Sequence, residues 1–385
     1  MDRTREARTS MILFFLLLIS GFLLLLYENA NAGIQIRVSL LQGVESVKLF
    51  APGGLNIKAS GPERISKKYT GPVKIVILPD GLTVNGIEIS GDLVRIMAVK
   101  GDELTLNDRH FRGIIEVKKK GERFIVINEI DIEDYLKGVV PTEVSPAWSV
   151  EALKTQAVAS RTYALYQRRA NINKDYHLVS SVMDQAYNGM DAEDPRASKA
   201  VAATKGMVLK YYGELILAMF HSTSPGATED GSNLWSIDLP YLKGVECPFD
   251  QKSPFYQWKR SIGLGELESA IRNGGFKIGA VANITPYLWS RSSRVIGLRI
   301  IHSEGELLLK GEDLRRLIGY SRLPSANFEI DEIGKDIIFS GKGAGHGVGL
   351  CQWGAKEMAG MGFRYQEILR YYFPGAEIAL YDSIR

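Results

Sequence analysis

The sequence predicts an α+β fold, in which a small N-terminal all-β domain precedes a mixed region of helices and antiparallel sheet. Two observations carry this prediction. Short runs of alternating apolar and polar residues, separated by Gly, Pro and Asp, fill residues 33–98, as strands with one buried face require. Residues 99–385 continue with strand-like hairpin runs, but interleave them with segments that we predict as helices, among them 263–275 and 311–319.

The first 32 residues carry the features of an export signal. Basic residues precede an uncharged, mostly apolar run at 11–27, and an Ala-Asn-Ala pattern follows at 30–32. The run is long for a cleaved signal and short for a membrane span, so residues 1–32 are either a signal peptide or an N-terminal membrane anchor. Both alternatives predict an exported, extracytoplasmic protein, where envelope polymers are available as substrates.

Composition and charge exclude further classes of function. The chain of 385 residues is 45% hydrophobic and 24% charged, which is typical of a globular protein. A formal net charge of +3 is too weak to indicate a nucleic-acid partner. The two cysteines, Cys247 and Cys351, either form one disulfide outside the cytoplasm or remain unpaired in the core, and the sequence does not separate these alternatives.

The first candidate for chemistry is Glu143. We expect it in a stiff loop between two prolines, after a helix that begins near Asp131 and before a helix over about 147–169 with Ser145 as N-cap. An apolar pocket would raise the pKa of this carboxyl group and make it a general acid. The alternative is a carboxylate at a helix amino end for dipole and capping reasons, which the spacing alone favours.

Arg161 lies among small residues in the middle of the second helix. A guanidinium buried there needs an anion. Arg161 therefore either contacts the substrate or forms a structural ion pair, and the sequence leaves both open.

Two further segments contain candidate residues. The polar loop 221–233 begins at His221 and precedes Tyr241 and Lys243; it either presents polar groups to a substrate or is a plain surface loop. In GKGAGHGVG, every second residue is glycine around His346. So little side-chain bulk allows close approach to the backbone, which favours a substrate contact or a metal ligand over a tight turn.

A cofactor is not expected, although zinc remains an alternative. Two histidines and both cysteines could supply a His₂Cys₂ set, but they lack the close pairs of a typical zinc site. The set would be His221, Cys247, His346 and Cys351.

The stretch DIEDYLKGVVPTEVSPAWSVEALKTQAVASRTYA resembles the signature of the stage II sporulation protein D family, SpoIID/LytB. HSTSPGATE, LPYLKGVE and GAGHGVGLCQWGA follow in the family's order, with departures at the SPG and LCQW positions. The resemblance covers residues 100–380. It implies a SpoIID-type catalytic region with a substrate groove. The implied activity is a peptidoglycan lytic transglycosylase that cleaves the bond from N-acetylmuramic acid to N-acetylglucosamine, preferably in peptide-stripped strands, and leaves 1,6-anhydro ends.

The same resemblance assigns roles to particular residues. It places the catalytic acid on Glu143 and a functional arginine on Arg161. The remaining candidates for substrate binding are Tyr241, Lys243, His221, His346 and Gln352.

Three functions stay open. A transglycosylase needs one glutamic acid, because the 6-hydroxyl of the sugar is its own nucleophile. A water-using muramidase needs a second carboxylate, for which Glu133, Asp134 and Glu151 are the local candidates. A non-catalytic protein could instead bind glycan strands and activate a cell-wall amidase. The sequence does not indicate whether the cell sporulates.

Overall fold

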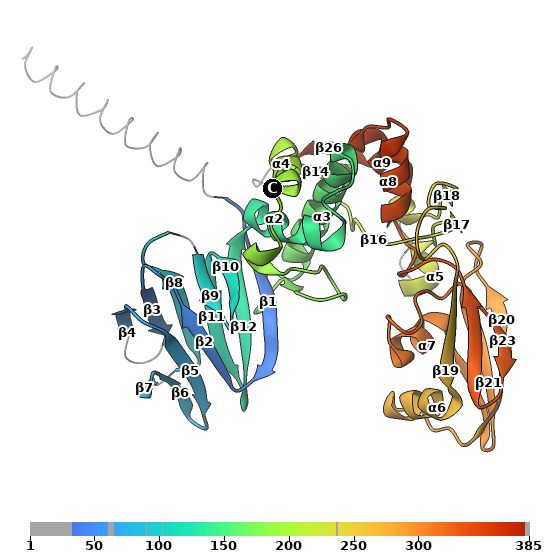
Figure 1. Cartoon of the computed structure of the whole chain (residues 1–385), viewed down its shortest axis with the longest axis horizontal. Helices are drawn as coiled ribbons and strands as arrows, with labels where there is room; N and C mark the ends of the chain where they lie inside the picture. The colour runs from blue at the N-terminus through green and yellow to red at the C-terminus, as the bar shows by residue number, and fades with distance from the viewer. Residues whose placement is uncertain (1–32, 61–64, 90, 102, 236–237, 382–385) are drawn as a thin grey trace, which may run out of the picture.

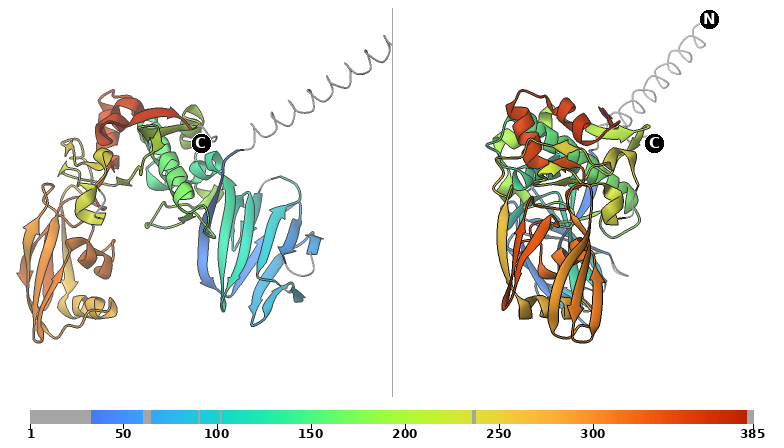
Figure 2. Two further views of the ribbon diagram at one scale, coloured as in Figure 1. Left: turned by 180° about the vertical axis from the view of Figure 1, so that it is seen from behind. Right: turned by 90° about the vertical axis from the view of Figure 1, so that its right-hand side faces the viewer.

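The computed structural model describes residues 33–381, except 61–64, 90, 102 and 236–237. The predicted signal or anchor at 1–32 lies outside the described residues. In space, the helical part lies between a β part and a second β part, and the chain returns to the helical part at its carboxyl end (Figures 1 and 2). Within the described ranges, no helix is long and apolar enough to cross a membrane.

The N-terminal part consists of two sheets that contribute to one apolar core. A seven-stranded sheet has the order β13-β1-β12-β11-β8-β3-β4, and a six-stranded sheet has the order β10-β9-β2-β5-β6-β7. Alternate residues such as Ile36 and Val38 are fully buried, as the alternating pattern predicts. The strands are β1 Gln35–Val44, β2 Ser46–Phe50, β3 Leu55–Ser60, β4 Ile65–Tyr69, β5 Val73–Leu78, β6 Gly81–Val84, β7 Ile87–Ile89, β8 Leu93–Ala98, β9 Glu103–Leu106, β10 Arg109–Arg112, β11 Ile114–Lys120, β12 Arg123–Asp131 and β13 Leu178–Val179.

The strand pairing extends this all-β part past residue 98, where the sequence suggested a boundary. β11 pairs with β8, and β12 pairs with both β11 and β1, all antiparallel. These later strands belong to the same sheet, so the continuous run of strands extends to Asp131, the N-cap of helix α2, and only the short β13 joins the sheet from further along the chain.

The helical part is built around α3, which is buried on most of its surface. Small residues such as Ala157, Ala159 and Ala164 let neighbouring backbones come close. A three-stranded sheet in this part has the order β15-β14-β26. The elements are α2 Ile132–Glu143, α3 Val150–Ala170, η1 Gly189–Ala192, α4 Pro195–Ala203, β14 Met207–Tyr211, β15 Glu214–Leu215, α8 Gln352–Gly360, α9 Tyr365–Tyr372 and β26 Glu377–Leu380.

One predicted helix start is confirmed and one is wrong. Asp131 caps α2, and its side chain accepts the backbone N–H groups of Glu133 and Asp134. The cap of α3 is Ser149, not Ser145. The chain makes a turn first, in which the Ser145 hydroxyl accepts the N–H of Ala147, and the helix starts only after this turn.

The second β part has its own apolar core and two three-stranded sheets, β19-β24-β23 and β20-β21-β22. The predicted helices at 263–275 and 311–319 are present as α6 and α7. The elements are β19 Trp258–Gly263, α6 Leu264–Asn273, β20 Val281–Trp289, β21 Val295–His302, β22 Gly305–Leu309, α7 Gly311–Ile318, β23 Phe328–Ile333 and β24 Asp336–Gly341.

Short elements join this part to the helices. The segment after residue 219 is not a plain loop, because β16 pairs in parallel with β25, and β17 pairs with β18. The elements are β16 Phe220–His221, β17 Gly226–Ala227, α5 Gly231–Trp235, η2 Pro240–Leu242, β18 Glu246–Cys247 and β25 Leu350–Cys351.

Candidate active site

Glu143 is the last residue of helix α2, not a loop residue, because the helix continues through Pro141. Its half-buried carboxylate accepts the backbone N–H of Ala186 at 2.7 Å from Oε1 and a hydrogen bond from the Gln352 side chain. The carboxyl end of a helix disfavours a negative charge, and α3 starts with its own cap at Ser149. The capping explanation for Glu143 therefore fails.

Burial raises the pKa of Glu143 to about 7, against the lowering effect of the hydrogen bonds from Ala186 and Gln352. Near neutral pH, both the protonated and the ionised form of a carboxyl group with this pKa are populated. It can therefore give up a proton and take one back under the same conditions, as acid–base catalysis requires.

A chain of amide side chains fixes the surroundings of this carboxylate. Gln352 Nε2 donates to Gln156 Oε1 at 3.4 Å, and Gln156 Nε2 donates to Ser160 Oγ at 3.0 Å. Gln185 Nε2 donates to the Ser160 carbonyl at 3.2 Å, and Gln185 Oε1 accepts the Tyr135 hydroxyl at 3.1 Å. Four of these side chains are almost fully buried and the fifth, Gln352, is 8% exposed, so the network holds its geometry.

Of this network, the sequence predicted only Gln352. Gln156 lies within the quoted signature, but nothing in its spacing indicated a polar role. Ala186 contributes through its backbone, which no side-chain pattern reveals.

Two tryptophans and a lysine lie next to these residues. Trp148 and Trp353 pack edge to face, with ring centroids 5.5 Å apart. Lys356 Nζ lies 3.8 Å from the centroid of the Trp353 ring and 5.6 Å from that of Trp148. Trp353 directly follows Gln352 in α8, and both tryptophans are only partly buried. Aromatic surface and a positive charge therefore gather at the start of α8, the helix that supplies the Gln352 donor to Glu143.

Arg161 has a structural place in the fold. It is fully buried, and its Nε and Nη2 atoms donate to the two carboxylate oxygens of Glu133 at 2.8 and 2.7 Å. The guanidinium also donates to the carbonyls of Met207 and Val201. These partners join α3 to α2, α4 and β14 and hold the guanidinium inside the fold, as the ion-pair alternative predicts, whereas a substrate contact by Arg161 stays a prediction.

Tyr241 and Lys243 lie in a different environment from Glu143. The Tyr241 ring is buried and its hydroxyl accepts the N–H of Leu217 at 3.3 Å, which gives it a place in the core, and its contact with a substrate stays a prediction. Lys243 is exposed and pairs with Asp238 at 2.5 Å and with Asp230 at 3.2 Å. Its contact with a substrate stays a prediction.

The two histidines lie close together. Their ring centroids are 5.6 Å apart, and His346 also packs edge to face against Trp235. His221 is buried, with Nδ1 at 3.1 Å from the Val348 carbonyl, and burial together with the charges of His346 and Arg294 lowers its pKa well below the usual value. A direct substrate contact by His221 does not fit this burial, whereas that of the half-buried His346 stays a prediction.

The alternating glycines serve contacts within the chain. Gly345 and Gly349 have φ values of +96° and +72°. A Cβ atom on Gly345 would lie 2.7 Å from that of His221, and one on Gly349 would lie 2.3 Å from the Met219 carbonyl oxygen. The close approach that the sequence predicted is therefore made by the segment before and within β16, rather than by a ligand.

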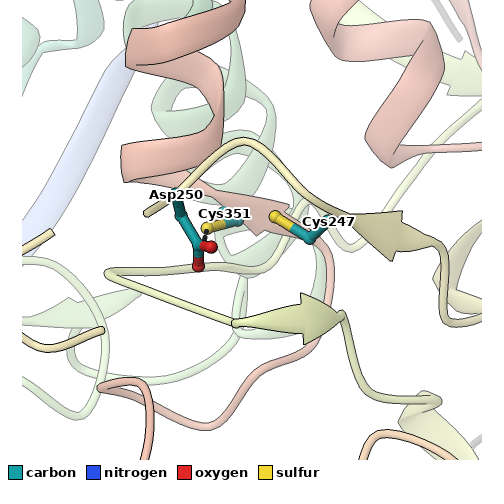
Figure 3. Close-up of side chains that lie close together, drawn as sticks. All are labelled: Cys247, Asp250 and Cys351. Carbon is teal, nitrogen blue, oxygen red and sulfur yellow. Dashed lines mark hydrogen bonds between the residues drawn. The ribbon is translucent and has the colours of Figure 1, made fainter. Parts of the chain in front are cut away.

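The predicted His₂Cys₂ set does not assemble as one group. Cys247 and Cys351 come together with a third residue, Asp250, and the potential ligand atoms of these three lie within 4.8 Å of one another (Figure 3). The two sulfurs are not bonded to each other. Neither histidine belongs to this group among the described residues.

The three carboxylates suggested for a muramidase are all engaged elsewhere. Glu133 pairs with Arg161, and Asp134 pairs with Lys137 at 2.6 Å. Glu151 pairs with Lys154 at 2.8 Å. These pairings leave none of the three suited to activating a water beside Glu143.

Comparison with known proteins gives several matches. A family profile described as stage II sporulation protein matches residues 120–211, and a domain of unknown function matches residues 241–349. An uncharacterized protein of Brachyspira hyodysenteriae is 34% identical over 370 residues, covering 93% of this chain and 96% of that protein. Stage II sporulation protein D of Bacillus subtilis is 31% identical over 275 residues, covering 67% of this chain and 77% of that protein.

A third relative is less similar and is matched over a smaller share of its length. The amidase enhancer of Bacillus subtilis is 28% identical over 294 residues, covering 64% of this chain and 40% of that protein. The stage II sporulation match at 120–211 includes α2, α3, Glu143 and the segment that supplies Ala186. From the profile match and the extended identity to the Bacillus subtilis protein, we conclude that the chain belongs to the stage II sporulation protein D family.

Proposed function

We propose that the protein is an exported lytic transglycosylase that cleaves peptidoglycan glycan strands at the bond from N-acetylmuramic acid to N-acetylglucosamine. The observation that carries this proposal is Glu143, a half-buried carboxyl group with a pKa of about 7 and two fixed hydrogen-bond donors. Family membership supports a role in the cell wall, in sporulation or in other remodelling.

In the proposed reaction, Glu143 first acts as the acid. Its proton passes to the glycosidic oxygen, and the bond between this oxygen and the anomeric carbon of the muramic acid breaks. The 6-hydroxyl of the same sugar attacks the anomeric carbon, and the Glu143 carboxylate accepts the hydroxyl proton. The products are a chain with a free 4-hydroxyl and a 1,6-anhydro end; no water is consumed, and Glu143 returns protonated.

The residues at the start of α8, around the Gln352 donor to Glu143, suit a glycan substrate. The partly exposed rings of Trp148 and Trp353 offer apolar faces on which a sugar ring can stack. Removal of the stem peptide leaves a lactyl carboxylate on muramic acid, and Lys356, which lies over the Trp353 ring and 3.7 Å from Glu357 Oε1, supplies a positive charge for it. We therefore expect Lys356→Gln to reduce the preference for peptide-stripped over peptide-bearing strands; an unchanged ratio of cleavage rates would remove Lys356 from the proposal.

The experiment compares the wild type with Glu143→Gln on peptide-free glycan strands, with product detection by mass spectrometry. Glu151→Gln is the matched control, because it makes the same chemical change in α3, at a carboxylate already paired with Lys154. Anhydro-ended fragments with the wild type and the control, but not with Glu143→Gln, are the expected result. Equal cleavage by Glu143→Gln would refute the proposed acid.

The amidase enhancer match supports a second candidate, a non-catalytic protein that binds glycan strands and activates a cell-wall amidase. In that case the wild type leaves isolated strands intact, still binds them, and stimulates an added amidase. Glu143→Gln would then keep both binding and stimulation, which separates this function from the first.

A further inference from the structure

A buried cluster of two thiols and a carboxylate lies between strands β18 and β25, at the start of helix α8. Cys247 comes from β18, Cys351 from β25, and Asp250 from the segment that follows β18. All three side chains are fully buried, and their potential ligand atoms lie within 4.8 Å of one another. Figure 3 shows the Asp250 carboxylate turned toward the Cys351 sulfur, with Cys247 on the other side of that sulfur.

The carboxylate of this cluster lacks partners that a buried charge requires. Asp250 Oδ2 accepts the N–H of Ser224 at 2.7 Å and lies 3.6 Å from the Cys351 sulfur. Its other oxygen, Oδ1, is buried without a hydrogen-bond partner among the described residues. Such an orphaned oxygen costs free energy unless a proton or a cation meets it.

The Cys351 sulfur lies at the start of a helix. Cys351 is the N-cap of α8, and its sulfur accepts the N–H of Gly354 at 3.4 Å. Burial, together with the neighbouring Cys247 and Asp250, raises the pKa of the Cys351 thiol well above its usual value, so a cation has to displace the thiol proton on binding. The geometry of the cluster offers two sulfurs and a carboxylate oxygen within reach of one cation.

We propose that Cys247, Asp250 and Cys351 bind one thiophilic divalent cation, with zinc the best fit to two sulfurs and one oxygen. Zn–S bonds of about 2.3 Å in a tetrahedral site place the two sulfurs about 3.8 Å apart, so the side chains need to move by roughly 1 Å at most. Both thiol protons leave to solvent on binding. A further oxygen lies close to the two sulfurs: the Tyr372 hydroxyl is 3.3 Å from Cys247 Sγ.

A disulfide between the two cysteines is the competing outcome. It would use both sulfurs but leave the buried Asp250 carboxylate without a cation, whereas a metal ion uses all three residues. The buried Asp250 is therefore what favours a metal ion over a disulfide.

Metal binding would also act on the candidate active site. Cys351 directly precedes Gln352, the donor to Glu143, so a cation on Cys351 fixes the start of α8 and with it this donor. This consequence rests on the proposed function, but the metal site itself does not.

The test uses the full chain, purified under reducing conditions, loaded with zinc and desalted, with zinc measured by elemental mass spectrometry. About one zinc per chain is expected for the wild type, with loss of at least tenfold in occupancy for Cys247→Ser, Cys351→Ser and Asp250→Asn. Asp108→Asn, in an exposed turn, is the matched control and should keep its zinc. Cobalt loading of the wild type should give a thiolate-to-cobalt charge-transfer band.

The outcomes separate the site from the proposed function. A wild type that binds no zinc under reducing conditions, or whose thiols resist alkylation because a Cys247–Cys351 bond has formed, overturns the site. Equal zinc occupancy in Asp250→Asn and the wild type also overturns it. If a variant does not fold, the cobalt spectrum of the wild type still decides. None of these readouts depends on glycan cleavage, so each proposal can fail without the other.

Discussion

Replacing Glu143 by glutamine should stabilise the protein at alkaline pH and leave its stability nearly unchanged at acidic pH. Glutamine keeps an oxygen that can accept the Ala186 N–H, but it carries no charge that burial would penalise. The pKa of Glu143 is raised to about 7 in the folded chain, so the folded state holds this proton where the unfolded state has already lost it. Wild-type stability therefore falls as pH rises from the unfolded pKa through the folded pKa.

The magnitude follows from the size of the pKa shift. The shift from 4.5 to about 7 corresponds to about 3 kcal/mol, at 1.36 kcal/mol for each pKa unit. The carboxyl group is half-buried rather than sealed, so we expect about 2 to 3 kcal/mol. The free energy of unfolding of the wild type, relative to Glu143→Gln, should fall by this amount between about pH 4 and about pH 8.

The assay is urea unfolding at a series of pH values, followed by tryptophan fluorescence, because Trp148 and Trp353 lie beside the site. Glu151→Gln is the control, for which we expect the opposite dependence of stability on pH. Burial acts to raise the pKa of Glu151, but Lys154 and the Tyr365 N–H outweigh it, and the net shift is downward. Glu151 thus stabilises the fold above the unfolded pKa and loses this effect as pH falls. A Glu143→Gln difference that does not vary with pH would refute the reasoning.

Three further predictions concern the surroundings of the site. Arg161→Ala should cost about 3 kcal/mol in chemical unfolding, because it leaves the partly buried carboxylate of Glu133 without its ion-pair partner, whereas Arg169→Ala in an exposed pair should cost under about 1 kcal/mol; similar losses would contradict the structural role. Gln352→Ala removes a donor to the site carboxylate and should move the pH–rate profile to higher pH, so an unchanged profile would exclude this contact. Gly349→Ala should lower the melting temperature far more than Gly362→Ala, since both have positive φ but only the first would meet backbone; equal shifts would show that φ alone matters.

Local sequence signals predicted the elements that local interactions determine. The alternating strands before residue 98 and the Asp131 cap of α2 are present because their causes lie within a few residues. The extent of the all-β part was missed, since β11 and β12 join the first sheet through pairing with distant strands. The length of α2 was missed too, because a proline in its last turn suggested an earlier end.

Glu143 and Gln352 were predicted as site residues, but the contacts that join them to the rest of the site were not. Glu143 follows from the motif, but the Ala186 N–H that binds it lies 43 residues away, and the Gln156–Gln352 contact spans 196 residues. For Arg161, the need for an anion was evident from burial, but the choice between a substrate and Glu133 required the packing of α3 against α2.

The most direct test of the central claim is the mass of the glycan ends released by the wild type in water labelled with heavy oxygen. Intramolecular attack by the 6-hydroxyl predicts 1,6-anhydro-muramic acid ends that contain no label and that are absent with Glu143→Gln. Labelled, hydrated ends would instead mean that water is the nucleophile, and would contradict the single-carboxylate mechanism on Glu143.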